Sequence, residues 1–343
     1  MNRYAISALC LCLLTGVARA QSTETPVAQE APAGVEAAAA EPVPEQIHVV
    51  AQRPGPGMWK VSKDEHVLWV FGAYGPVPKD MVWRSQQVER VIAGSQEFLS
   101  PPVASARPGL FKYVTLLPRL IGVRKNPDGA RLRDVLPAED YARWSALKAK
   151  YLPGNDDVER ERPIFAAQVL TEGARRQAGL YDGKRVREQV LDLVERNKLK
   201  VTSATFEIPM DNAGKVLSNF KKSSANDAAC LVRTMATLEE DIADASARAE
   251  AWSRGDMDAL RRLDFTTRRE ACFGALMNSV AFDAEPEFRN AKARAHEKWI
   301  AQAERALAAN ASTFAMLQIE DILDPQGVIA TLAARGYMVE QPE

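Results

Sequence analysis

The sequence predicts an α/β fold in which related N- and C-terminal halves share one central sheet. Uninterrupted apolar runs at 66–71 and 313–319 are typical of strands that are buried on both faces. Each run is followed by a loop, a helical pattern and a shorter strand. A strand–loop–helix–strand unit is a crossover connection, which places its strands in one shared sheet. The periodicity between the two ends is mainly helical, so we also expect a helical insert.

The N-terminal unit consists of the strand at 66–71, a loop over 72–78, a helix over 83–93 and a strand over 97–100. Glycine and proline interrupt the apolar run at the loop. Two prolines follow the second strand, and we expect them to end it, because proline has no N–H to donate to a neighbouring strand.

Helical patterns follow. One helix carries apolar residues from Tyr141 to Tyr151, a second starts at Pro163, and a third covers 186–196. Proline suits the first position of a helix, where its missing N–H costs nothing. A strand with one exposed face is expected at 198–206.

The helical insert, at about 225–310, is expected to contain an antiparallel hairpin. Apolar residues spaced alternately four and three apart from 231 to 252 predict a long helix. A second stripe, from 265 to 280, predicts the helix that packs against it. Another long helix is expected from Pro286 to Asn310.

The C-terminal unit repeats the order of the first. After the strand at 313–319 we expect a loop over 320–324, with Asp324 as a helix N-cap and Pro325 at the first helical position. Gly336 would end this helix, and 337–340 would form the closing strand.

Open sheets of this kind bind ligands beyond the carboxyl ends of their strands. A cleft is therefore expected between the loops 72–78 and 320–324, and the long helix from Pro286 could place a histidine there. The candidate cleft residues are Gly72, Tyr74, Gly75, Glu320, Asp321 and His296. The carboxylates of Glu320, Asp321 and Asp324 could hold a hard cation such as Ca²⁺ or Mg²⁺. We favour the alternative that they are capping and solvated loop residues.

Composition excludes several functions. Lys and Arg number 44 against 45 Asp and Glu, a net charge of −1, so no basic excess indicates a nucleic-acid binder. Three histidines are too few for a histidine-rich metal cluster. No serine lies in a Gly-x-Ser-x-Gly turn, the usual context of an α/β-hydrolase nucleophile.

Residues 1–20 resemble a signal peptide. Arg3 precedes an apolar stretch over 4–18, and Ala18-Arg19-Ala20 fits a cleavage site, so we expect cleavage after Ala20 rather than a retained anchor. Residues 21–46 contain five glutamates, four prolines and no Lys or Arg, which is typical of a disordered linker. A single domain over 47–343 follows. The sequence has a bacterial character, so we expect a periplasmic or secreted protein that is not an integral membrane protein.

Cys230 and Cys272 are the only thiols of the expected mature chain. An even number of cysteines in an oxidising compartment favours a disulfide between them. Two buried free thiols are the alternative.

Four segments resemble the TraB/GumN family, which includes the Tiki metalloproteases. They cover most of the chain from Gly57 onward and are the string Gly57-Met-Trp-Lys-Val-Ser with Leu68-Trp-Val-Phe-Gly72, then 132–144, 163–167 and 327–339. The resemblance implies an α/β fold with two related halves and a metal-centred site at the ends of the first and last strands.

The residues that would hold this metal depart from the family pattern. A Gly-x-x-His motif after the first strand is replaced by Gly72-Ala-Tyr-Gly75, and a Gly-x-x-His-Leu motif after the last strand by a segment with Ile322 at the histidine position. We therefore expect a non-catalytic member without a cofactor, which binds an envelope protein or a glycan. The alternative is a metal-dependent hydrolase or peptidase with a divalent metal relocated to Glu320, Asp321 or His296. Six tryptophans could include a glycan platform, although most suit core positions.

Overall fold

The computed structural model describes residues 55–106, 116–118, 120–209, 211–222, 227–262 and 286–342. The expected signal peptide and linker, and the second helix of the expected hairpin with Cys272, lie outside these ranges. In the described part no helix has the length and apolar character needed to cross a bilayer.

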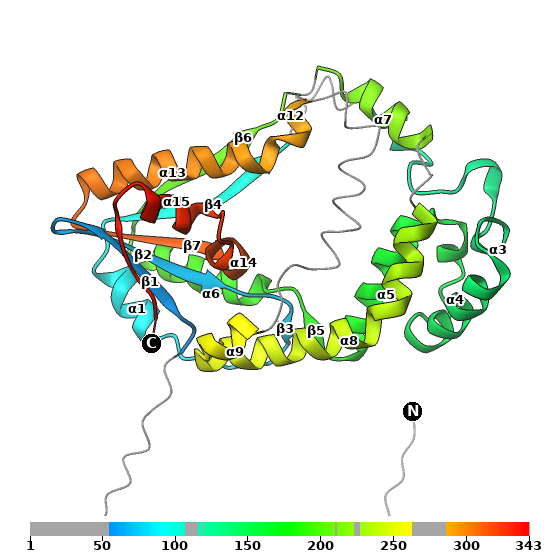
Figure 1. Cartoon of the computed structure of the whole chain (residues 1–343), viewed down its shortest axis with the longest axis horizontal. Helices are drawn as coiled ribbons and strands as arrows, with labels where there is room; N and C mark the ends of the chain where they lie inside the picture. The colour runs from blue at the N-terminus through cyan, green and yellow to red at the C-terminus, as the bar shows by residue number, and fades with distance from the viewer. Residues whose placement is uncertain are drawn as a thin grey trace, which may run out of the picture. The chain divides into compact units, whose positions relative to one another are not determined.

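A six-stranded sheet lies at the centre of the fold, in the order β6-β4-β7-β2-β1-β8 (Figure 1). Neighbours β2, β7, β4 and β6 are parallel, whereas β1 is antiparallel to both β2 and β8. The mixed α/β class is therefore confirmed. The strands are β1 (Met58–Lys63), β2 (His66–Ala73), β4 (Glu97–Ser105), β6 (Lys200–Glu207), β7 (Ser312–Gln318) and β8 (Met338–Glu340).

Both ends of the chain cross over onto this sheet, as expected. The N-terminal unit runs from β2 through α1 (Gln86–Ala93) to β4, and the C-terminal unit runs from β7 to β8. The two apolar runs of the sequence are β2 and β7, which are paired in parallel with Phe71 opposite Met316. Strand β7 inserts between β2 and β4, so the two halves interlock.

The prediction that prolines end β4 is wrong. The strand continues through Pro101 and Pro102 to Ser105. Its ladder with β7 stops at Leu99, and its register with β6 shifts between Leu99 and Pro102. This irregularity accommodates the two residues that cannot donate a ladder hydrogen bond.

The connection after β7 also differs from expectation. Residues 320–324 were expected to form a loop, but α14 (Ile319–Leu323) follows the strand directly. The next helix, α15 (Val328–Ala334), has Gly327 rather than Asp324 at its N-cap, so the predicted Asp324–Pro325 start is wrong. The Asp324 carboxylate instead accepts a hydrogen bond from the backbone N–H of Gln326 at 2.8 Å, which stabilises the turn between the helices.

Helices cover the two faces of the sheet. Phe71 points to the face covered by α1 and α6 (Lys184–Arg196), where its ring lies 5.5 Å from that of Trp83, which itself bonds Gln189 of α6. The neighbouring Gly72 faces the opposite side, towards α14. Helices α14, α15 and α13 (Ala291–Ala309) contact one another on this side (Figure 1).

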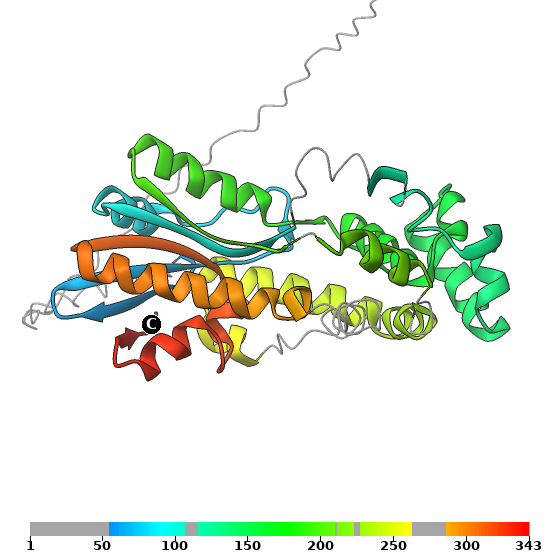
Figure 2. The same ribbon diagram turned by 90° about the horizontal axis from the view of Figure 1, so that it is seen from above.

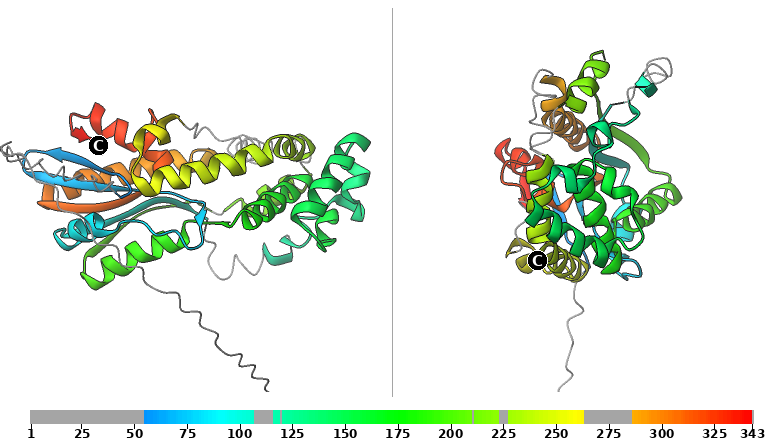
Figure 3. Two further views of the ribbon diagram at one scale, coloured as in Figure 1. Left: turned by 90° about the horizontal axis from the view of Figure 1, so that it is seen from below. Right: turned by 90° about the vertical axis from the view of Figure 1, so that its right-hand side faces the viewer.

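A second hydrophobic core lies among helices α4 (Ala138–Tyr151), α5 (Pro163–Gln177) and the first half of α8 (Asp227–Arg254). Helix α8 also contributes Ala249 and Trp252 to the core of the sheet. Figures 2 and 3 show α8 running from the sheet alongside α5. The expected helices at 141–151, 163 onward, 186–196 and 231–252 are thus confirmed as α4, α5, α6 and α8.

The remaining elements are short. The expected strand at 198–206 is confirmed as β6, and the helix expected from Pro286 is broken at Asn290. The others are β3 (Val77–Pro78), η1 (Pro127–Gly129), α3 (Leu132–Val135), η2 (Asp157–Arg160), β5 (Leu180–Tyr181), α7 (Ala213–Lys222), α9 (Met257–Arg262) and α12 (Pro286–Arg289).

Candidate functional site

The carboxyl ends of β2 and β7 bring the two predicted loops together. Ala73 lies opposite Gln318 at the last pair of the β2–β7 ladder, and the chain then continues to Tyr74 on one side and to Glu320 on the other. The candidate residues therefore lie on two segments that leave the sheet at neighbouring points.

Gly72 is a packing position. A Cβ built on Gly72 would lie 2.9 Å from the ring of Trp59 and 3.3 Å from Ile322. These two side chains therefore pack directly against the backbone of Gly72. The carbonyl of Gly72 accepts a hydrogen bond from Trp252 Nε1 at 2.6 Å. This residue ties β2 to α8 on one face and to α14 on the other.

Tyr74 is buried among charged side chains. Its ring is almost fully enclosed, and its hydroxyl donates to the carbonyl of Ala245 on α8 at 3.3 Å. Burial raises the pKa of Tyr74, Arg248 and Arg175 lower it, and Glu320 raises it, with burial the largest effect. The phenol is therefore neutral at physiological pH and serves as a hydrogen-bonding group between α8 and the end of β2.

Gly75 occupies the position where the resemblance implies a histidine. A Cβ built there would lie 2.5 Å from the backbone nitrogen of Gly183, and a Cβ on Gly183 would lie 2.5 Å from the carbonyl oxygen of Tyr74. Real Cβ atoms do not approach backbone atoms this closely. The two glycines thus meet backbone to backbone, and the space that an imidazole would need is filled.

His296 on α13 and Asp321 on α14 approach each other, whereas Glu320 lies close enough to Tyr74 to affect its pKa. His296 Nε2 lies 3.7 Å from Asp321 Oδ1, and Lys292 Nζ lies 3.3 Å from the same oxygen. Burial lowers the pKa of His296, Asp321 and then Asp324 oppose this, and Lys292 adds to the lowering. His296 thus faces the site, but its neighbouring carboxylate is shared with an ammonium group.

The donor set does not fit the metal that the resemblance implies. Divalent metals need imidazole, carboxylate or thiolate ligands that converge on one point. Gly75 offers no side chain, and Ile322 is buried against Gly72 and has no donor atom. Across the ranges given above, no three His, Cys, Asp or Glu side chains come together in a way that could hold a metal ion.

Three basic residues of this region were missed by sequence reasoning: Arg175, Arg248 and Lys292. Arg248 carries a recognisable signal. It is buried on the face of α8 that also buries Ala245, Ala249 and Trp252, and an arginine within an apolar helical stripe needs a polar partner in the interior. Arg175 and Lys292 carry no such signal, because their proximity to the site depends on how α5 and α13 pack.

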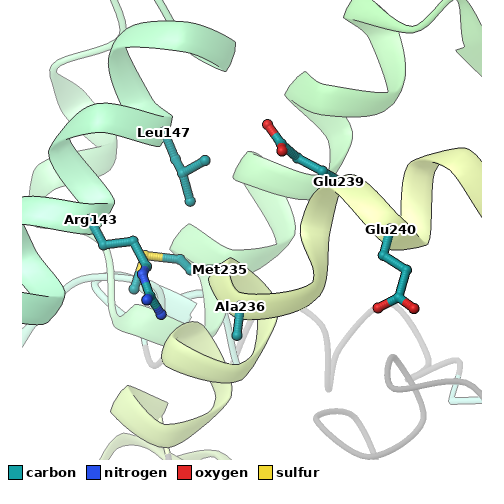
Figure 4. Close-up of a pocket in the computed structure, with 6 residues that line it drawn as sticks. All are labelled: Arg143, Leu147, Met235, Ala236, Glu239 and Glu240. Carbon is teal, nitrogen blue, oxygen red and sulfur yellow. The ribbon is translucent and has the colours of Figure 1, made fainter.

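A separate groove lies between α4 and α8, away from the ends of the strands. It encloses about 350 Å³, and Figure 4 shows its walls. The apolar lining is Leu147, Met235 and Ala236, and the charged lining is Arg143, Glu239 and Glu240. The sequence predicts Leu147 and Met235 on the apolar faces of their helices, and it indicates none of the six as a functional residue.

Tryptophans offer little to a sugar ring. Five of the six are buried in the two cores, and Trp69 is half-buried. The indication that most of them suit core packing is confirmed.

Comparison with known proteins gave one result. A family model described as the TraB/PrgY/gumN family matches residues 57–341. Searches of the curated proteins and of the solved structures gave no match.

Proposed function

The chain belongs to the TraB/PrgY/gumN family, and from this premise we propose that it is an exported pseudoenzyme, a periplasmic binding or accessory protein of the cell envelope. The observation that carries the proposal is the backbone contact between Gly75 and Gly183 at the position of the family's first histidine. A lost ligand alone could be replaced by a neighbour. A filled space cannot accept the ligand back without moving the backbone.

Charge at the site supports the same proposal. Arg248 and Arg175 lie close enough to Tyr74 to lower its pKa, and Lys292 lies beside Asp321. Cations held at a few ångströms repel a divalent metal, and this repulsion is strong where water is largely excluded. The site is therefore suited to holding polar or anionic groups rather than a metal ion.

The buried tryptophans favour a protein over a glycan as the envelope partner. Sugar rings are commonly bound on exposed aromatic faces. Among the residues that the structure describes, such faces are scarce, whereas large aliphatic side chains are exposed at several points. Examples are Val82 at 90%, Val201 at 60% and Val103 at 46%. Exposed aliphatic groups gain more from contact with another apolar surface than from contact with a sugar.

Metal analysis of the purified mature protein, starting at Gln21, tests the proposal. We expect substoichiometric Zn, Mn and Co, and unfolding that a chelator does not change. Stoichiometric metal together with chelator-sensitive peptidase activity would contradict it.

The close approach of His296 and Asp321 favours one alternative, a hydrolase whose metal has moved to α13 and α14. The variants His296→Gln and Asp321→Asn separate the two functions. Any metal-dependent activity that a relocated site supports would be lost in both variants. Under the proposed function, binding of metal is equally low in the wild type and in both variants.

Export is tested separately. The proposed cleavage after Ala20 predicts that the periplasmic fraction contains a chain whose intact mass begins at Gln21. Retention of residues 1–20 in the cell-associated fraction would contradict export.

A further inference from the structure

Three aliphatic side chains are exposed close together in the segment before η1. Leu117 and Leu120 are each 41% exposed, and Ile121 is 75% exposed. Isolated exposed aliphatic residues are normal on protein surfaces, but three within five positions form a patch whose exposure to water is unfavourable unless something covers it.

The sequence around this patch is rich in basic residues. Between Glu97 and Asp128 the sequence contains five Lys and Arg residues and no Asp or Glu, although the whole chain is close to neutral. Lys125 is exposed in the same segment. Arg124, by contrast, forms a salt bridge with Glu161 at 2.9 Å, so its charge is neutralised within the protein.

Helix α7 adds further positive charge at the same place. Lys221 Nζ in its last turn donates to the carbonyl of Ile121 at 2.6 Å. Lys215 and Lys222 are exposed and lie seven positions apart, on one side of the helix, while Ala213, Val216 and Phe220 are buried on the other.

Buried contacts hold both segments on α5. The backbone N–H of Arg162 donates to the carbonyl of Arg124 at 2.8 Å, and its guanidinium donates to the carbonyl of Phe220 at 2.8 Å. One buried residue therefore fixes the segment that carries the aliphatic residues and the helix that carries the lysines.

We propose that these groups form a basic aliphatic surface, made of Leu117, Leu120, Ile121, Lys125, Lys215 and Lys222, that docks the protein on anionic phospholipid membranes. Both components of this surface interact favourably with a bilayer, because aliphatic side chains enter the boundary of the acyl chains and lysines attract anionic headgroups. The complementary charge favours a lipid surface over an apolar protein groove, which would leave the lysines unpaired. This docking goes beyond the proposed function and does not depend on the content of the cleft.

Co-sedimentation of the mature protein with lipid vesicles tests the proposal. The probes are vesicles of phosphatidylcholine alone and vesicles that also contain phosphatidylglycerol. We expect the protein to bind the anionic vesicles at low salt and to dissociate at high salt.

Two variants and a matched control locate the surface. The double variant Leu120→Ser, Ile121→Ser is expected to lower vesicle binding by roughly tenfold, and Lys215→Gln, Lys222→Gln by a similar factor. The control Val82→Ser, Val201→Ser changes two exposed aliphatic residues elsewhere and should bind as the wild type does. All four positions of the aliphatic variants are exposed, and unchanged melting temperatures would show that each variant is folded.

Three results would overturn the proposal: no binding to anionic vesicles, equal binding to neutral vesicles, or equal loss in the control variant. None of these results concerns metal content or export, so the proposed function is tested independently of membrane binding.

Discussion

Arg162 Nε lies 2.6 Å from Asp227 Oδ2, and the two side chains are 2% and 6% exposed. This ion pair joins the start of α5 to the start of α8. The guanidinium also stacks on the ring of Phe220, whose centroid lies 4.3 Å away. Arg162 thus connects α5, α7 and α8.

Removing one partner of this pair should be costly. Replacing Arg162 by Ala leaves the Asp227 carboxylate buried without its counter-charge, and we expect unfolding free energy to fall by about 3–5 kcal/mol. The control Arg335→Ala removes an exposed pair with Glu304 and should cost at most about 1 kcal/mol. Urea unfolding measures both. Similar losses of unfolding free energy in the two variants would show that the buried ion pair stabilises the fold no more than the exposed pair does.

A histidine restored at position 75 should not rebuild the family's metal site. The variant Gly75→His forces a Cβ against the backbone of Gly183. We expect the free energy of unfolding to fall by about 1–3 kcal/mol, with no gain of bound metal. At Gly94, by contrast, an added Cβ meets its nearest atom at 3.6 Å, so Gly94→Ala is the matched control. Thermal unfolding and metal analysis measure both effects. A Gly75→His protein that is stable and binds metal would show that position 75 has room for a ligand side chain.

Glu97 should make stability depend on pH in the acidic range. Burial opposes ionisation of Glu97, but hydrogen bonds from Thr202, Asn310 and Lys200 outweigh it, so the pKa is lowered. A carboxyl with a lowered pKa in the folded state stabilises the fold above its unfolded pKa of about 4.3, and this stabilisation is lost as the pH falls through the folded pKa.

The variant Glu97→Gln isolates this effect. We expect the wild type to be more stable than the variant at neutral pH, with the difference shrinking as the pH falls below about 4. Melting temperatures across a pH series measure it. A difference that does not change with pH would mean that the carboxylate charge contributes nothing.

The proposed disulfide predicts a dependence on reductant. Cys230 is buried in the second core, and Cys272 lies outside the described residues. Closing a loop of this length would stabilise the fold by roughly 4 kcal/mol in the chain-entropy model. Cys272→Ser should therefore lower the melting temperature without reductant, and reductant should lower that of the wild type but not that of the variant. Equal melting temperatures under all conditions would exclude the bridge.

Burial patterns made the centre of the sheet predictable. The central residues of strands β2 and β7 are continuously apolar because both faces of the strands are covered, and this is visible in the sequence. Strand β1 was missed, since its residues Lys60 and Ser62 interrupt the apolar pattern and its place depends on pairing with β2 and β8. Helix α14 lies where the sequence predicts a loop. The packing of Ile319 and Ile322 against Gly72 accompanies this helix, and it joins segments far apart in the chain.

The site was predictable in position but not in chemistry. Strand ends placed Tyr74, Glu320 and Asp321 near one another, as a parallel sheet requires. The contact between Gly75 and Gly183 and the approach of Arg248 involve residues far apart in the chain, and no local pattern encodes them. Such close backbone approaches become visible only when the packing of distant segments is known.

Helix α8 supplies a wall to both hydrophobic cores, with Leu231 and Leu238 in one and Ala249 and Trp252 in the other. Unfolding of either core alone is therefore unfavourable, because it would expose apolar side chains of a helix that the other core still holds in place. Heating should consequently melt the α/β part and the helical part in one cooperative step, as if the chain had a single stability rather than two.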